Sequence, residues 1–430
     1  MTTTTTPSER GPVKAGERVL APDLARGCML LLIVLANTVF YLWGSERSPG
    51  SAHPVDGSVA DKITQVVLVA GVDMRSYPMF AFLFGYGIVQ LLSRQLATGT
   101  QERDARALLR RRHLWLLVFG VAHAALLWMG DILAAYGMTG LILCWLFLRR
   151  SDRVLLVWSA VLSGLVLTLS LALVVLAALA PEGTAGGAPL DYVPFLTSNI
   201  SETSYLASIP GRLPAWLYLV VIQGFVLLVL PVSMLLGFWA ARRRVLEEPG
   251  QHLRLLRATA VVGLGGGVLL GGLPYALARV DVLSVSTLMK EALSLTHMTS
   301  GLFGGVGYVA VFALISHRIS RRGGVGRLGG AIVATGRRSL SAYLAQSVLC
   351  APLLAAWGLG WGASFGSAQM ALFAIGVWLL TVVASALLER AGRRGPAEVV
   401  LRRLTYRTRG ATASPAASRS QDGPTERVTT

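Results

Sequence analysis

The sequence predicts an all-α fold, a polytopic bundle of about ten transmembrane helices with both termini in the cytoplasm. Three observations predict it: repeated apolar segments, a charged fraction of 14% against roughly 25% in soluble domains, and basic residues that are unevenly distributed between the segments. A helix of about 20 residues crosses the hydrocarbon core of a bilayer, so each apolar segment can form one span. The expected spans are residues 24–43, 66–93, 113–129, 131–148, 154–180, 213–240, 258–277, 299–317, 331–355 and 368–388.

The distribution of basic residues predicts the orientation of these spans. All but six of the 39 Lys and Arg residues lie in the terminal segments, or in loops on the same side of the membrane as the N-terminus. Basic loops stay on the cytoplasmic side, so this side is expected to be cytoplasmic and the protein to be a multi-pass protein of the bacterial cytoplasmic (inner) membrane. The exceptions are Arg47, Lys62, Arg75, Arg212, Arg279 and Lys290.

The same distribution argues against nucleic-acid binding, although the net charge is +17 and the isoelectric point is about 10.7. A nucleic-acid binder concentrates its charge on one face or arm. Here the arginines occupy short loops beside apolar segments, as in Arg110–Arg112 and Arg242–Arg244. Topology and contact with anionic head groups account for them, so membrane lipids are the expected partners.

The sequence predicts neither a metal site nor a cofactor. The six histidines are scattered without zinc-ligand spacing. The triplet Gly265–Gly267 has no preceding strand and no following Lys-Ser/Thr, which a phosphate-binding loop requires. The cysteines Cys28, Cys144 and Cys350 all lie within expected spans, where they are interpreted as small packing residues.

The expected organisation is one transmembrane domain, residues 18–388, with an extracytoplasmic loop at 181–212. Residues 1–17 and 410–430 have the composition of disordered tails. Between them, residues 389–409 are expected to form an interfacial cytoplasmic helix. Gly395-Pro396 marks its start, and its arginines are expected to face anionic lipid.

Polar groups at the start of the first span form the first candidate cluster. Asp23 and Arg26 are spaced i, i+3 and can neutralise each other, so they are interpreted as a structural pair that caps and anchors the helix. Asn37 lies about 16 Å deeper at 1.5 Å per residue. A buried amide there either bonds to a neighbouring helix or lines a polar cavity, which makes Asn37 a candidate substrate-binding residue.

The third and fourth spans carry the candidate catalytic pair, His123 and Asp131. Met129-Gly130 predicts a very tight turn, which places His123 beneath Asp131 and at the depth of Tyr136. A carboxylate can orient an imidazole and raise its basicity, the arrangement used by general bases. The alternative is that Asp131 caps the fourth span and His123 bonds to a neighbouring helix.

Three further residues are candidate substrate-binding groups, together with Tyr136 and Asn37. Arg75, near the outer end of the second span, is suited to an anionic head group or substrate, or to snorkelling at the membrane boundary. Tyr343 and Gln346 recur with Ser347 at i, i+3 and i+4, which makes one polar stripe on an apolar helix. Such a stripe faces other helices or a water-filled cavity.

Several segments resemble a known family. They are RVLAPDLARGCMLLLIVLAN (18–37), MFAFLFGYGIVQLL (79–92), AHAALLWMGDILAAYGMTGLI (122–142), GRRSLSAYLAQS (336–347) and RRGPAEVVLRRLTY (393–406). In this order they resemble the YeiB-like, domain-of-unknown-function 418 family of bacterial integral membrane proteins. The resemblance covers nearly the whole chain except the tails and the 181–212 loop.

The family is distantly similar to multi-span membrane acyltransferases, whose first span reads Asp-x-x-Arg-Gly followed by a histidine eleven residues after the Arg. Asp23, Arg26 and Gly27 match this pattern, but Asn37 stands where the histidine is expected. An amide cannot act as a general base at neutral pH. If the chain is a transferase, its base therefore comes from elsewhere, and His123 is the best-placed candidate.

Two functions of different class follow. One is an enzyme that transfers an acyl or related group to an envelope glycan or lipid. The other is a transporter or flippase-like conduit for an anionic or lipid-linked substrate, favoured by many spans and polar stripes, although the sequence shows no inverted repeat.

Overall fold

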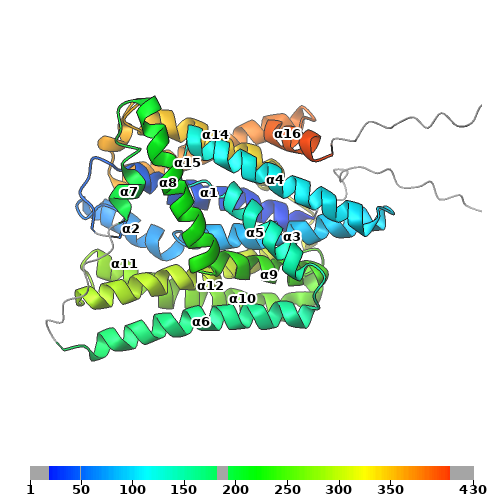
Figure 1. The fold of residues 1–430 in the computed structure, drawn as a ribbon, viewed down its shortest axis with the longest axis horizontal. Helices are drawn as coiled ribbons and strands as arrows, with labels where there is room; N and C mark the ends of the chain where they lie inside the picture. Colours follow the sequence, from blue (N-terminus) through cyan, green and yellow to red (C-terminus); the bar gives the residue numbers. More distant parts are fainter. Residues whose placement is uncertain (1–18, 49, 182–191, 407–430) are drawn as a thin grey trace, which may run out of the picture.

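The computed structural model describes residues 19–48, 50–181 and 192–406, and the regular elements of these residues are helices. The tails expected at 1–17 and 410–430 lie outside the described residues. Most helices run along one common direction, and α8 crosses it obliquely (Figure 1). We name the two ends of the bundle after short helices there: the α7 end on the left of Figure 1, and the α16 end on the right.

Seven stretches of the described chain are long and apolar enough to cross a membrane, and three more apolar helices are shorter. The protein is therefore a multi-pass membrane protein. The long stretches are Leu20–Tyr41, Val59–Ala97, Asp152–Leu179, Tyr205–Val226, Pro249–Arg279, Thr287–Arg321 and Ser367–Arg390. The shorter helices are Leu133–Phe147, Val229–Arg242 and Ser339–Leu354.

The helices that build the bundle and its sites have the following bounds: α1 (Leu20–Thr38), α2 (Val59–Gly71), α3 (Ser76–Ala97), α4 (Glu102–Leu126), α5 (Leu133–Phe147), α6 (Asp152–Leu179), α7 (Val193–Thr197), α8 (Tyr205–Val221), α9 (Val229–Arg242), α10 (Leu253–Leu264), α11 (Leu273–Arg279), α12 (Thr287–Arg321), α13 (Arg327–Arg337), α14 (Ser339–Leu354), α15 (Ser367–Arg390) and α16 (Pro396–Thr405).

The most extensive helix packing joins α3 to α9, where two glycines allow the backbones to approach. A β-carbon at Gly85 would lie 2.5 Å from the carbonyl oxygen of Met234, and one at Gly237 would lie 2.3 Å from that of Phe82. Small residues are the usual means of close packing between membrane helices. Helix α6 lies on the outside of the bundle and exposes leucines and valines, as expected of a surface that faces lipid (Figure 1).

Two of the expected spans are each divided between two helices. The segment 213–240 belongs to α8 and α9, which are separated by a π-helical turn and by Leu228 in the left-handed region with φ 56°. Pro231 gives the physical reason, because its ring clashes with the carbonyl four residues earlier and prevents one continuous helix. The segment 331–355 is divided between α13 and α14 at Arg338.

Two other expected spans are also interrupted. The segment 66–93 is broken between α2 and α3, where Met74 adopts φ 60°. The segment 258–277 passes from α10 through a π-helical stretch, Gly265–Gly272, into α11. Irregular backbone inside a membrane protein is stable only where other protein groups satisfy its polar atoms, and both interruptions are contacted by Arg75, as described below.

The connection between α4 and α5 is longer than the expected turn at Met129-Gly130, because α4 ends at Leu126 and α5 begins at Leu133. The two helices still form a hairpin. A β-carbon at Gly120 of α4 would lie 2.4 Å from the backbone nitrogen of Ala134, so the glycine brings the start of α5 against α4.

Helix α16 is fastened to the α16 end of the bundle by Glu398. Its Oε1 accepts hydrogen bonds from the backbone nitrogens of Leu340 and Ser341, at 2.9 and 3.2 Å, and the Ser341 hydroxyl donates to Oε2. These nitrogens lie in the first turn of α14, where the helix itself offers no partner. The carboxylate of one helix therefore caps another. Arg111 of α4 holds the far end of α16 by donating to the carbonyl of Thr405, at 3.2 Å.

Replacing Glu398 by Ala should destabilise the folded protein by about 0.5–2 kcal/mol, the usual cost of losing a helix cap. We expect thermal unfolding in neutral detergent to occur a few degrees lower than in the parent. Glu46→Ala is the matched control, because Glu46 is exposed. Equal melting temperatures for the two variants would contradict the capping role.

Candidate functional site

The His123 and Asp131 side chains form a buried pair at the α4–α5 hairpin. Nδ1 of His123 lies 2.7 Å from Oδ2 of Asp131, and the two residues are 4% and 3% exposed. The other carboxylate oxygen, Oδ1, accepts a hydrogen bond from the backbone nitrogen of Ala134, at 3.0 Å. Asp131 thus both holds the imidazole and caps α5, which combines the His–carboxylate pair with the capping role of the alternative interpretation.

Tyr343 of α14 covers the histidine. The two rings meet edge to face with centroids 5.2 Å apart, and the backbone nitrogen of Ile132 lies 3.4 Å from the tyrosine hydroxyl. The remaining ring nitrogen of His123, Nε2, is buried without a hydrogen-bond partner among the described residues. We call His123, Asp131 and Tyr343 the septum. Tyr343 lines the larger of the two cavities described next, and Gly130 and Ile132, the chain neighbours of Asp131, line the other.

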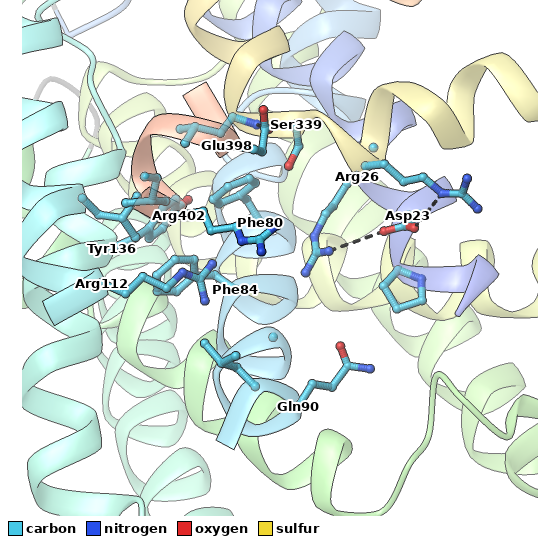
Figure 2. Close-up of a pocket in the computed structure, with 18 of the residues that line it drawn as sticks. Asp23, Arg26, Phe80, Phe84, Gln90, Arg112, Tyr136, Ser339, Glu398 and Arg402 are labelled. Carbon is cyan, nitrogen blue, oxygen red and sulfur yellow. Dashed lines mark hydrogen bonds and ion pairs between the residues drawn. The ribbon is translucent and has the colours of Figure 1, made fainter. Parts of the chain in front are cut away.

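The larger cavity opens at the α16 end and measures about 360 Å³ (Figure 2). We call it the arginine cavity, since five arginines and two carboxylates line it: Arg26, Arg94, Arg112, Arg337, Arg402, Asp23 and Glu398. Figure 2 shows Arg26, Arg112 and Arg402 turned toward one common space, from α1, α4 and α16 respectively.

The inner wall of the arginine cavity is aromatic. The ring of Phe80 stacks on Tyr136 with centroids 4.9 Å apart, and the ring of Phe84, one turn further along α3, stacks on Tyr136 at 5.7 Å. The Arg112 guanidinium lies over Phe84, 5.7 Å from the ring centroid. At the rim, burial raises the pKa of the Tyr406 phenol above its ordinary value, so this side chain stays neutral. The cavity is therefore charged at its mouth and apolar at its base.

A second cavity of about 190 Å³ lies at the α7 end, and we call it the outer cavity. Its polar wall includes a second His–Asp pair, in which Nε2 of His53 lies 2.6 Å from Oδ2 of Asp73. Asn37 and His297 also line it, and Trp128 contributes an aromatic surface.

A third, narrow space shares lining residues with both cavities. It measures about 10 Å³, room for about one water molecule. Asn37 and Trp128 line both this space and the outer cavity, while Tyr343 lines both this space and the arginine cavity. Gln346 belongs to the narrow space too, and its amide nitrogen donates to the carbonyl of Leu30, at 3.1 Å.

Four of the five substrate-binding candidates therefore each line at least one of the three spaces. Tyr136 is in the arginine cavity, where its hydroxyl donates to the carbonyl of Tyr77 at 2.8 Å. Asn37, Tyr343 and Gln346 are around the narrow space. The structural pair, Asp23 and Arg26, also lines the arginine cavity, with charged atoms 3.7 Å apart.

Arg75 is not part of this arrangement. It is fully buried, and its guanidinium donates to the carbonyl of Asp73, at 2.6 Å, and to that of Gly267. Its Nη1 also lies 2.7 Å from Nδ1 of His297. The backbone of Asp73, and not its carboxylate, is the partner, because the carboxylate bonds to His53. Arg75 thus joins the α2–α3 break to the glycine-rich π-helical stretch and to α12.

Sequence reasoning missed three site residues, namely His53, Arg112 and Arg402. His53 lies in a loop that the span pattern gives no reason to place inside the bundle. The two arginines belong to basic clusters that topology already explains, so nothing in the pattern distinguishes a lining arginine from one that faces lipid. Only the packing of α16 against α4 and α14 shows which arginines line the cavity.

Comparison with known proteins agrees with the family resemblance. Residues 240–408 match a family model described as "Protein of unknown function (DUF418)". The match covers the C-terminal part of the chain. The chain is similar to "Uncharacterized protein YeiB" of Escherichia coli (strain K12), with 28% identity over 403 residues, which cover 92% of this chain and 98% of the relative.

It is also similar to "Uncharacterized protein YxaH" of Bacillus subtilis (strain 168), with 26% identity over 92% of this chain and 96% of the relative. A shorter match joins it to "Uncharacterized 39.9 kDa protein in amylase 3'region" of Bacillus acidopullulyticus, with 33% identity over 31% of this chain and 35% of the relative. The chain is thus homologous to YeiB and YxaH over most of its length, and both relatives are bacterial.

His123→Gln should abolish function at near-parental abundance, because glutamine retains a hydrogen-bonding group beside Asp131 but cannot exchange a proton at neutral pH. Asp131→Ala should instead lower thermal stability strongly, since it removes both the partner of His123 and the cap of α5. The function is measured as restoration of the parental envelope lipid and glycan profile in a deletion strain. Full restoration by His123→Gln would make the pair purely structural.

Proposed function

We propose that this DUF418 protein is a transporter or flippase-like conduit of the bacterial cytoplasmic membrane for an anionic, lipid-linked substrate. The observation that carries the proposal is the pair of cavities at opposite ends of the bundle, together with a narrow space that shares lining residues with both. A protein that moves a molecule across a bilayer has a binding site accessible from each side in turn, and a barrier that separates the sides.

In this proposal the α16 end is cytoplasmic and both termini lie there. The basic loops support this orientation, because positively charged loops stay on the cytoplasmic side. Ten passages follow if α2 with α3, α8 with α9, α10 with α11 and α13 with α14 each count as one broken span, while α1, α4, α5, α6, α12 and α15 are single spans.

The broken helices are a second support. Transporters commonly build their binding sites from discontinuous helices, whose interrupted backbone lines a cavity. Ile222, at the break between α8 and α9, and Met74, at the break between α2 and α3, both line the outer cavity. The septum is the proposed barrier, and rotation of the Tyr343 ring would join the narrow space to the arginine cavity.

A second candidate function is transfer of an acyl or related group to an envelope glycan or lipid. The specific observation in its favour is the buried Nε2 of His123, whose opposite ring nitrogen bonds to Asp131. This is the arrangement of a general base with an orienting carboxylate. His123 is absent from the lining of all three spaces, so a substrate would reach it only after Tyr343 moves.

Alternating access can be tested with a cysteine in the narrow space. Ser347 lines this space and is 8% exposed, and Ser347→Cys changes its size little. On a background in which Cys28, Cys144 and Cys350 are replaced by Ala, a small membrane-impermeant thiol reagent should label it both in intact cells and in inside-out vesicles. Labelling from one side only would refute the conduit and leave the transferase.

The orientation can be tested with exposed cysteines on the same background. Ser201→Cys, in the α7–α8 loop, should react with an impermeant reagent in intact cells, whereas Gln101→Cys, before α4, should react only in inside-out vesicles. Both positions are exposed, so access to the aqueous phase decides the result. The reverse pattern would invert the topology.

A further inference from the structure

We infer that the arginine cavity binds the phosphate group of an amphiphile, with the phosphate held between Arg26, Arg112 and Arg402 and the hydrocarbon part against the aromatic base. This inference deepens the proposed function and rests on it only for the idea that the bound molecule moves onward. The binding site itself stands on the geometry of the cavity (Figure 2).

The charge balance of the cavity favours an anionic ligand, because its two carboxylates already have partners. Asp23 is shared between Arg26, at 3.7 Å, and Arg337, at 3.4 Å. Glu398 accepts hydrogen bonds from the first turn of α14. Arg94, Arg112 and Arg402 have no carboxylate of the described residues within 4.0 Å, so the wall carries an excess of positive charge.

Arg112 gives the clearest sign of a ligand. It is only partly exposed, its guanidinium lies over Phe84, and it makes no side-chain hydrogen bond to the described residues. A guanidinium presents five N–H donors in a planar fork that matches the oxygens of phosphate. The contact with Phe84 places the guanidinium beside one wall of the cavity (Figure 2).

The number and origin of the arginines favour phosphate over carboxylate. Arg26, Arg112 and Arg402 come from three different helices and converge on one space. A carboxylate has two oxygens and one charge, which suit a single guanidinium fork. A phosphate monoester has three free oxygens and close to two charges at neutral pH, so it can accept from several forks at once.

The aromatic base favours an amphiphile over free phosphate. A cavity of about 360 Å³ is within the usual range for sites that bind small organic molecules, roughly 300–1,000 Å³. Phe80, Phe84, Tyr136 and Leu133 form its inner wall, and they offer an apolar surface that free phosphate would leave unused. An alkyl or isoprenoid chain attached to the phosphate would cover that surface.

The test uses the full-length protein purified in neutral detergent, with hexyl phosphate as the probe and titration calorimetry as the measurement. Hexanol and inorganic phosphate are run separately. We expect hexyl phosphate to bind at least about tenfold more tightly than either, since both halves of the molecule contribute. Equal affinity for inorganic phosphate would refute the amphiphile, and absence of hexyl phosphate binding would refute the site.

Two arginine variants locate the binding. Arg112→Gln should weaken hexyl phosphate binding by about tenfold or more, the usual effect of losing hydrogen bonds to a charged group. Arg110→Gln is the matched control, because Arg110 lies on the same helix, carries the same charge and is exposed. Unliganded melting temperatures show that both variants fold. Equal affinities of the two variants would place the binding outside the cavity.

The result of the binding test can be distinguished from the result of the conduit test. Hexyl phosphate binding that depends on Arg112, combined with Ser347→Cys labelling from one side only, would keep the binding site and reject the conduit. Labelling from both sides without hexyl phosphate binding would keep the conduit and reject the phosphate ligand.

Discussion

Polar and charged groups inside a bilayer find their partners within the protein, and this constraint organises the whole bundle. Arg75 is the strongest case, because it is fully buried and its donors are satisfied mainly by backbone carbonyls and by His297. Those carbonyls belong to the break between α2 and α3 and to the glycine-rich π-helical stretch, where the regular helical pattern is interrupted. One cation therefore stabilises two irregular segments that a bilayer would not tolerate in contact with lipid.

The same constraint explains why the septum lies where it does. His123 and Asp131 can be buried because each satisfies the other, and because Asp131 also caps α5. Tyr343 covers the pair from α14, and the position of α14 depends in turn on Glu398 of α16. A short helix at one end of the bundle is thus linked, through a cap and the apolar helix α14, to the septum.

The two cavities differ in the charge of their linings. This difference indicates which end of the bundle accommodates an anionic substrate in the proposed functions. The arginine cavity keeps its positive charge in excess and near water, where arginines retain hydration and can exchange it for an anion. In the outer cavity the carboxylate of Asp73 is already bonded to His53. The nearby Arg279 does not line this cavity and donates to the carbonyls of His53 and Pro54. An anionic head group is therefore better accommodated at the α16 end, and neutral or weakly polar groups at the α7 end.

The sequence by itself determined the membrane character and the all-α fold, and it carries the motifs of the family resemblance, because length, hydropathy and short motifs are local properties of a chain. It also placed His123 near Asp131, since only one hairpin separates them. It could not show that Arg75 lies apart from that pair, that 213–240 bends into two helices, or that Arg112 and Arg402 share a cavity with Arg26. These features depend on contacts between segments as many as 376 residues apart, from Arg26 to Arg402, which hydropathy and spacing do not encode. Tertiary packing decided them. Every span meets the bilayer's requirement for apolar length equally well, so the few polar and small residues inside the bundle determine which helices become neighbours.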